Sequence, residues 1–172
     1  ISHAHIDHYG LLHFIHPSIP VYLSKGTRRI IDISALFKLS APPPSKVCNF
    51  EMYKRFQIGG FSVMPFLMDH SAFDAAAFEI SDEEKTIIYT GDFRGHGRKA
   101  VCLDRFIDKA KKGADVLLIE GTMFGRQDEE VITELELEER LVKKIENFIK
   151  PVLFQSSSQN IDRLVSFYRA AA

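Results

Sequence analysis

The sequence lacks the features that mark several large classes of protein. Its two cysteines, Cys48 and Cys102, lie far apart and form no CxxC pair, so a disulfide framework is not expected and a reducing compartment is favoured. No stretch holds the ~18–20 apolar residues of a membrane helix, and charged or polar side chains interrupt any signal-peptide pattern at the start. The formal net charge is only -1, which gives no overall basic footprint for nucleic acid. We therefore expect a cytoplasmic protein without a membrane segment.

The chain has 172 residues, of which 45% are hydrophobic, and this suffices for one domain of ordinary size. It contains neither internal repeats nor low-complexity segments. Hydrophobic patterning predicts strands at 21–23, 54–58, 61–67, 75–80, 86–90, 116–119 and 152–154. It predicts helices at 27–37, where Thr27 serves as the cap, at 104–112, at 129–149 and from residue 160 onward. Strands interspersed with helices indicate an α/β layered fold.

Two of these elements carry a further expectation. The segment 116–119 is entirely apolar, which is typical of a strand that is buried on both faces. The segment 129–149 has a wide apolar stripe, which favours packing on the protein's own sheet. The alternative for that helix is a coiled-coil homodimer.

Four side chains of the kinds that bind metals crowd the first eight positions: His3, His5, Asp7 and His8. A spacing of two places His3 and His5 on the same side of an extended segment, whereas ligands on a helix recur every three or four residues. Asp7 and His8 then point elsewhere, so one short loop can supply two metal ions. Imidazole with carboxylate suits zinc, and also manganese or iron. The alternative is a histidine-rich surface tract without a role.

Three further polar residues follow predicted strands: His70 after 61–67, Asp92 after 86–90 and Glu120 after 116–119. Taken alone, His70 would be a structural histidine and Asp92 a turn or helix-cap residue. Because the opening motif is also present, we instead expect all three strand ends to lie with it at one edge of a sheet. Asp92 is then placed to bridge two metal ions.

Several of these motifs resemble those of one family. Residues 2–10 (Ser-His-Ala-His-Ile-Asp-His-Tyr-Gly) resemble the HxHxDH signature of the metallo-β-lactamase fold superfamily. Residues 69–71, 91–92 and 120–122 follow in the order that this superfamily uses. The longer segments 69–75 and 120–126 resemble its β-CASP branch, most closely ribonuclease J-like enzymes. Residues 154–163 are similar to the start of the β-CASP domain.

The resemblance implies a fold and a division of the chain. It implies an αββα sandwich, in part, over residues 1–150, and the beginning of a β-CASP domain over residues 151–172. The strands that precede the first motif in this family are absent, as are the last metal-binding histidine and the β-CASP histidines, because no histidine follows His96. We therefore expect the chain to be part of a longer protein.

The resemblance also implies a ligand set for two divalent metal ions, most simply zinc. The first ion would be held by His3, His5 and His70. The second would be held by Asp7 and His8, with Asp92 bridging the two ions. Glu120 would orient a ligand from just outside the metal shell. The catalytic candidates are therefore Asp7, Asp92 and Glu120.

The expected reaction is metal-dependent hydrolysis of a phosphodiester in RNA or, as a weaker expectation, in single-stranded DNA. Arg94 and Arg126 lie close in sequence to Asp92 and Glu120, where they would contact phosphates. Ser157 precedes a predicted helix whose N-terminus would bind another phosphate, although plain helix capping is an alternative use. Two other functions remain open: a small-molecule thioester or lactone hydrolase, and a non-catalytic scaffold subunit or inactive fragment.

Overall fold

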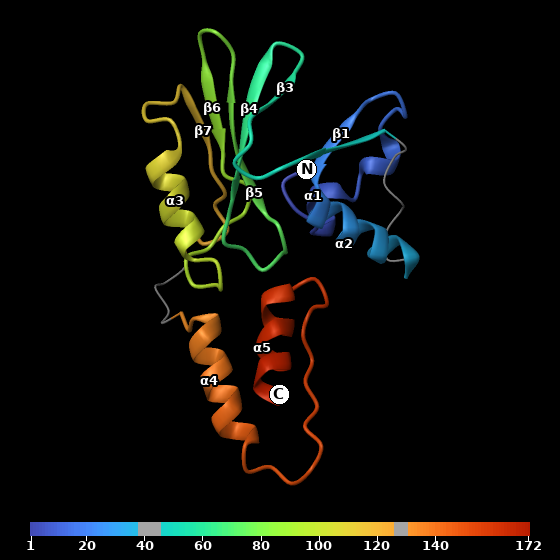
Figure 1. Ribbon diagram of the computed structural model, residues 1–172, viewed down its shortest axis with the longest axis vertical. Coiled ribbons are helices and arrows are strands. Elements are labelled where there is room, and N and C mark those ends of the chain that lie inside the picture. The colour runs from blue at the N-terminus through green and yellow to red at the C-terminus, as the bar shows by residue number, and fades with distance from the viewer. Residues whose placement is uncertain (38–45, 126–130) are drawn as a thin grey trace.

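A five-stranded sheet with different layers on its two faces organises the molecule (Figure 1). The computed structural model describes residues 1–37, 46–125 and 131–172. The strands are β1 (Val21–Ser24), β2 (Val47–Phe50), β3 (Phe56–Ile58), β4 (Phe61–Leu67), β5 (Ala76–Ser81), β6 (Thr86–Tyr89) and β7 (Val116–Leu118). The helices are α1 (Ile6–Tyr9), the 3-10 turn η1 (Leu12–Phe14), α2 (Lys25–Leu36), α3 (Val101–Lys109), α4 (Glu134–Ile145) and α5 (Ile161–Ala171).

The strand order in the larger sheet is β3-β4-β5-β6-β7. Neighbouring strands are antiparallel from β3 to β6, and β7 pairs with β6 in parallel. Strands β4, β6 and β7 therefore run in the same direction, and their C-terminal ends lie at the same edge of the sheet. The hairpins predicted around Gly59-Gly60 and across residues 81–85 are both present.

Alternation of side chains along β4 gives the sheet two apolar faces. Phe66 and Met68 point toward α3, where the Phe66 ring meets the Phe106 ring edge-on with centroids 5.4 Å apart. On the opposite face, Phe50 of β2 meets Phe78 of β5 with ring centroids 5.3 Å apart. The layers run in the order α3, large sheet, small sheet, and then α1 with α2, which confirms the predicted α/β sandwich (Figure 1).

The small parallel sheet β1–β2 carries α1 and α2 on its outer side, where Val21, Leu23 and Ile31 form the core. The prediction that Thr27 caps α2 is wrong. The helix begins at Lys25, because the Ser24 hydroxyl accepts the Thr27 amide hydrogen at 3.0 Å and fills the cap position. Strand β2 had no counterpart among the predicted strands.

Strand β7 corrects a second expectation. Its residues Val116, Leu117 and Leu118 are 43%, 57% and 52% exposed, so the strand is not buried on both faces. It is the edge strand of the sheet, paired only with β6 among the described residues. A continuous apolar run indicates that both faces can be covered, but it does not determine which layers cover them.

The C-terminal helices also differ from expectation. Helix α4 begins later than predicted because Thr133 and Glu136 form a reciprocal capping box; residues 129–130 lie outside the described residues. It packs along α5 below the sheet rather than on the sheet itself (Figure 1). The predicted strand at 152–154 is an irregular segment, whereas α5 begins directly after its cap Asn160, as expected.

Two predicted absences can be compared with the described part of the chain. Cys48 and Cys102 are both free thiols, as expected. Within residues 1–37, 46–125 and 131–172, we find no helix with the length and apolar character needed to cross a membrane.

Gly91, in the turn after β6, provides a test of this fold. Its backbone has φ +57°, and a β-carbon there would lie 2.7 Å from the Ala76 carbonyl oxygen. We expect Gly91→Ala to lower the free energy of unfolding by about 1–3 kcal/mol in urea titrations, because the left-handed backbone and the contact both oppose a side chain. Gly60→Ala is the matched control, since no atom beyond its chain neighbours lies within 4 Å of the position that its β-carbon would take. Equal stability of the two variants would contradict this account of the turn.

Candidate metal centre

The edge where β4, β6 and β7 end gathers the predicted polar side chains. His70 lies three residues beyond β4, Asp92 three residues beyond β6 and Glu120 two residues beyond β7. The opening segment joins the same edge, because the Ser2 carbonyl oxygen accepts the Ala76 amide hydrogen at 3.0 Å. The expected convergence of these four chain segments is therefore present in the structure.

Five of the predicted ligand side chains form two overlapping groups. His3, His5 and His70 make the first, and His3, His8 and Asp92 make the second; within each group, the ligand atoms all lie within 4.8 Å of one another. The His5 Nδ1 and His70 Nε2 atoms are 3.1 Å apart, and the His8 Nε2 and Asp92 Oδ2 atoms are 3.3 Å apart. Two ligands of one tetrahedral zinc ion, each at about 2.0–2.1 Å from it, lie roughly 3.3 Å apart. The spacing therefore suits an ion of this kind.

Asp92 occupies the middle of the cluster, and Asp7 lies at its rim. Asp92 Oδ2 is 3.3 Å from Nε2 of His8, 3.9 Å from Nε2 of His3 and 4.0 Å from Nε2 of His70. This central position fits the bridging role that was expected of it. The Asp7 side chain is 74% exposed, and its Oδ2 atom lies 3.6 Å from His8 Nε2. Asp7 therefore faces the cluster from its solvent side.

The protonation states of the histidines favour metal binding. Burial, reinforced by the neighbouring His8, lowers the pKa of His3 to about 2. Burial, reinforced by the neighbouring His5, lowers the pKa of His70 to about 4. Burial also lowers the pKa of His5. Neutral imidazoles are the form that coordinates metals, so the site holds its ligands ready at neutral pH.

One buried atom tests whether a metal ion fits this group of residues. The His3 side chain is fully buried, yet its Nε2 atom has no hydrogen-bond partner among the residues that the structure describes. Burying a polar atom without a partner costs about 1–3 kcal/mol. A divalent ion beside Nε2 would satisfy this atom, and the surrounding nitrogen and carboxylate donors suit zinc. The residues present therefore fit a metal ion.

Ser2 has a role that sequence reasoning missed. Its hydroxyl oxygen lies 3.2 Å from Nδ1 of His3 and 3.3 Å from Nδ1 of His8. If both Nδ1 atoms carry hydrogen, they donate to this one oxygen, which has two lone pairs, and both Nε2 atoms are left free for a metal. The only sequence signal is a serine directly before the first histidine.

Glu120 belongs to neither ligand group. Its carboxylate accepts the Phe93 amide hydrogen at 2.7 Å, and its own amide lies 3.4 Å from the Thr90 hydroxyl. It therefore holds the backbone on both sides of Asp92 rather than touching the histidines. A hollow of about 400 Å³ opens between β7 and this turn, and both Asp92 and Glu120 line it.

The residues predicted to contact phosphate are placed differently. Arg94 is largely buried, and its guanidinium pairs with Asp162 and lies 3.7 Å from Glu134. Its charge is therefore paired with carboxylates of the protein and does not face a phosphate site. Arg126 lies outside the described residues. Ser157 is exposed, and its hydroxyl accepts the Gln159 amide hydrogen at 3.3 Å. Asn160, not Ser157, caps α5.

A groove lies beside the cluster, and Ser157 forms part of its wall. Its volume is about 740 Å³, and it runs between α1, which carries Asp7 and His8, and the segment before α5. Among the residues that the structure describes, no charged side chain lines it. The lining residues are Ile6, Tyr9, Ile30, Ile33, Ser34, Phe37, Ser157, Ser158, Gln159 and Ile161.

Comparison with known proteins identifies the family. The model of the beta-lactamase superfamily domain matches residues 1–147 of this chain. The chain belongs to the beta-lactamase superfamily. Membership, together with the fold, supports a metal-dependent hydrolase in general terms and a divalent metal ion at the cluster.

Individual relatives cover the chain unequally. Ribonuclease J of Sinorhizobium meliloti (strain Sm2011) is 32% identical over 96 residues, which are 55% of this chain but 17% of that enzyme. A crystal structure of a protein of unknown function from Enterococcus faecalis V583 matches with TM-score 0.84 and 26% identity, over 96% of this chain and 42% of that one. The metallo-beta-lactamase fold protein YhfI of Bacillus subtilis matches with TM-score 0.53 and 23% identity, over 80% of this chain and 56% of that one. The chain thus spans less than two thirds of each of these relatives.

The lowered histidine pKa values predict how stability depends on pH without metal. In the unfolded chain histidine binds a proton near pH 6.5, whereas folded His70 does so only near 4 and folded His3 only near 2. Between pH 6.5 and 4 the unfolded state therefore binds more protons, so stability falls as the pH falls. Each of these two histidines contributes a slope of up to about 1.4 kcal/mol per pH unit.

Urea titrations at pH 7, 5.5 and 4.5 in the presence of a chelator measure this slope. We expect His70→Gln to reduce it by close to one histidine's contribution. His16→Gln is the matched control, because that histidine is exposed and, among the described residues, its ring bonds to nearby Ser18. The same slope in wild type and His70→Gln would contradict the prediction.

Proposed function

We propose that this chain carries the metal centre of a phosphodiesterase that hydrolyses RNA or, as a weaker proposal, single-stranded DNA. The observation that carries the hydrolase part is the pair of overlapping ligand groups, His3 with His5 and His70, and His3 with His8 and Asp92. Five donors within one small volume, at the edge where three parallel-running strands end, form a site for divalent metal ions.

Each side chain has a proposed part in binding the ions. His3, His5 and His70 would hold one ion, and Asp7 and His8 the other, with Asp92 between them. When bound, such a pair of ions lowers the pKa of a shared water from ~15.7 towards neutrality. Asp92 would orient this water from the middle of the cluster, and Asp7 would do so from the exposed rim. Glu120 would keep Asp92 in place through the Phe93 amide.

The nucleic-acid substrate is supported by similarity rather than by surface charge. The chain is 32% identical to Ribonuclease J of Sinorhizobium meliloti over 96 residues. Arg94 no longer supports the proposal, because buried acids already pair with it. Arg126 and Ser157 remain candidates for contacts with RNA. The groove beside α1 would accept a base or sugar, since its described lining is uncharged and includes Ile6 and Tyr9, the neighbours of Asp7 and His8 in that helix.

A small-molecule hydrolase is the second candidate, and the same groove favours it. Of the ten described residues that line it, six are aliphatic or aromatic and none is charged. An acyl or other apolar group would fit there while a thioester or lactone bond approached the ions. The basic side chains after Asp92 already form ion pairs within the protein, which disfavours contacts with RNA phosphates: Arg98 pairs with Glu138, and Lys99 with Asp162.

Turnover assays distinguish these candidates. The purified protein is loaded with Zn²⁺ or Mn²⁺ and incubated with labelled single-stranded RNA, single-stranded DNA, and a panel of thioesters and lactones. We expect hydrolysis of RNA, and we expect His70→Ala and Asp92→Asn each to lower the rate at least about 100-fold. This estimate is conservative, because residues that only support metal ligands already cost about 10–100-fold when replaced.

Asp32→Asn is the matched control, since Asp32 is an exposed carboxylate that pairs with Arg28 on α2. It should leave the rate unchanged. Hydrolysis of a thioester or lactone but not of RNA would move the assignment to the second candidate. No turnover of any substrate by the metal-loaded protein would contradict both and favour a non-catalytic scaffold.

A further inference from the structure

The backbone of both histidine-bearing segments is held by residues that have no proposed part in binding the metal ions. The Lys99 ammonium donates to the His70 carbonyl oxygen at 3.1 Å. The first residue of α5, Ile161, donates its amide hydrogen to the Ser71 carbonyl oxygen at 3.1 Å. The Gln159 side-chain amide donates to the carbonyl oxygen of Ala4, between His3 and His5, at 3.4 Å. The start of α5 therefore touches both halves of the ligand set.

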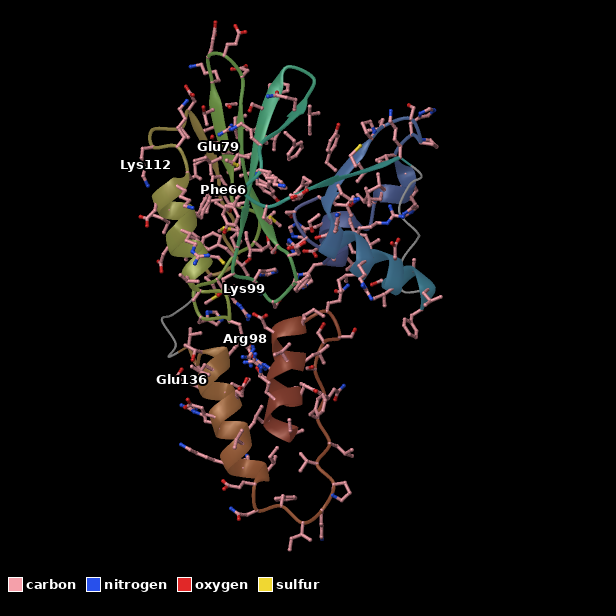
Figure 2. All side chains as sticks on the ribbon, viewed as in Figure 1. Phe66, Glu79, Arg98, Lys99, Lys112 and Glu136 are labelled. Atoms are coloured by element: carbon pink, nitrogen blue, oxygen red, sulfur yellow. The ribbon has the colours of Figure 1, made fainter. Side chains whose placement is uncertain are left out.

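Lys99 is fixed in turn by a buried carboxylate. Its ammonium nitrogen lies 3.1 Å from Oδ1 of Asp162, in the first turn of α5, and Asp162 is only 6% exposed. The other carboxylate oxygen pairs with Arg94 and accepts the Arg98 amide hydrogen at 3.4 Å. A buried charge is stable only when it is paired in this way. Figure 2 shows Lys99 between the lower end of the sheet and the two C-terminal helices, and Arg98 between α4 and α5, where it bonds to Glu138 and Ser166.

Hydrogen bonds to Asp69 hold the backbone of the loop that carries Lys99, which follows Asp92. Asp69, directly before His70, is fully buried and accepts the Gly97 amide hydrogen at 2.7 Å and the Lys99 amide hydrogen at 3.2 Å. Its own carbonyl oxygen accepts the Arg94 amide hydrogen at 2.8 Å. The loop that leaves Asp92 is thus closed back onto the residue next to His70. The backbone from which the Lys99 side chain extends is therefore held close to His70.

We propose that the Lys99–Asp162 pair is a positioning device for His70, through which α5 sets the geometry of the metal centre. Neither residue reaches the ligand atoms, so the pair acts through the backbone of His70. A metal site needs its ligands within about 0.5 Å of the productive geometry, and a tether on the ligand's own carbonyl group supplies this control. The inference rests on the proposed role of His70 as a metal ligand.

The test compares metal affinity with the stability of the metal-free protein. Lys99→Met keeps the apolar stem but removes the donor, Lys99→Arg keeps a positive donor, and Asp162→Asn keeps the shape of the side chain but removes its charge. Lys85→Met is the matched control, because Lys85 makes a similar pair with Asp115 at 2.9 Å, in the exposed turn before β6. For each protein, Zn²⁺ affinity is measured by chelator competition, the absorption spectrum is recorded with bound Co²⁺, and apo-protein unfolding is followed in urea.

We expect Lys99→Met and Asp162→Asn to weaken Zn²⁺ binding by about 10–100-fold and to alter the Co²⁺ spectrum. Lys99→Arg should recover most of the affinity, and Lys85→Met should remain within twofold of wild type. The inference would be overturned if these variants lowered the stability of the apo-protein but left the Zn²⁺ affinity and the Co²⁺ spectrum of the folded protein unchanged. The Lys99–Asp162 pair would then stabilise the fold without positioning His70. If Lys99→Met fails to fold, Asp162→Asn decides the question by the same criteria.

The outcome for the wild-type protein separates this inference from the proposed function. Wild-type protein that binds no Zn²⁺ would overturn both. Wild-type protein that binds Zn²⁺ through His70, with both pair variants unaffected, would overturn only the role of Lys99 and Asp162.

Discussion

Close packing of uncharged imidazoles at one sheet edge is the constraint on which the rest of this structure depends. A metal site needs several donors close together, and here His3, which is buried, lies among four half-buried donors. Withdrawing donors from water in this way costs free energy. His3 shows the cost most clearly, because its buried Nε2 atom has no hydrogen-bond partner among the described residues and burial lowers its pKa to about 2. The surrounding structure must therefore hold the donors together against their own preference for water.

Three features of the fold supply this restraint. Strands β4, β6 and β7 run in one direction, so the residues that follow them emerge at one edge. Gly91 permits the close approach of the Asp92 turn to Ala76, which in turn holds the Ser2 carbonyl. Buried carboxylates then close the loops: Glu120 through the Phe93 amide, and Asp69 through the Gly97 amide. The basic residues after Asp92 serve this internal network, which explains why they are poorly placed to meet a polyanion.

The sequence was sufficient for those parts of the site that depend on local spacing. Alternating histidines, and polar residues at the ends of apolar strands, predicted which side chains would meet. The sequence was insufficient where the role of a residue depends on a contact with a residue far away in the chain. Arg94 looked like a phosphate contact because its acidic partner Asp162 lies 68 positions away, and nothing local indicates that pair. Strand β7 looked buried because hydrophobicity reports what can be covered, whereas its place at the sheet edge is set by topology. The assignment of residues 151–172 to a second domain stays a prediction.

Zinc K-edge X-ray absorption of the Zn²⁺-loaded protein, combined with elemental analysis, tests the central claim most directly. The structure predicts at least one ion per chain, surrounded only by nitrogen and oxygen, with the multiple-scattering signature of several imidazoles at about 2.0–2.1 Å. Replacement of His70 by Ala should remove imidazole scattering and reduce the metal content. Sulfur at about 2.3 Å would place the ion on a cysteine instead, and a protein that retains no ion would contradict a metal centre in this chain.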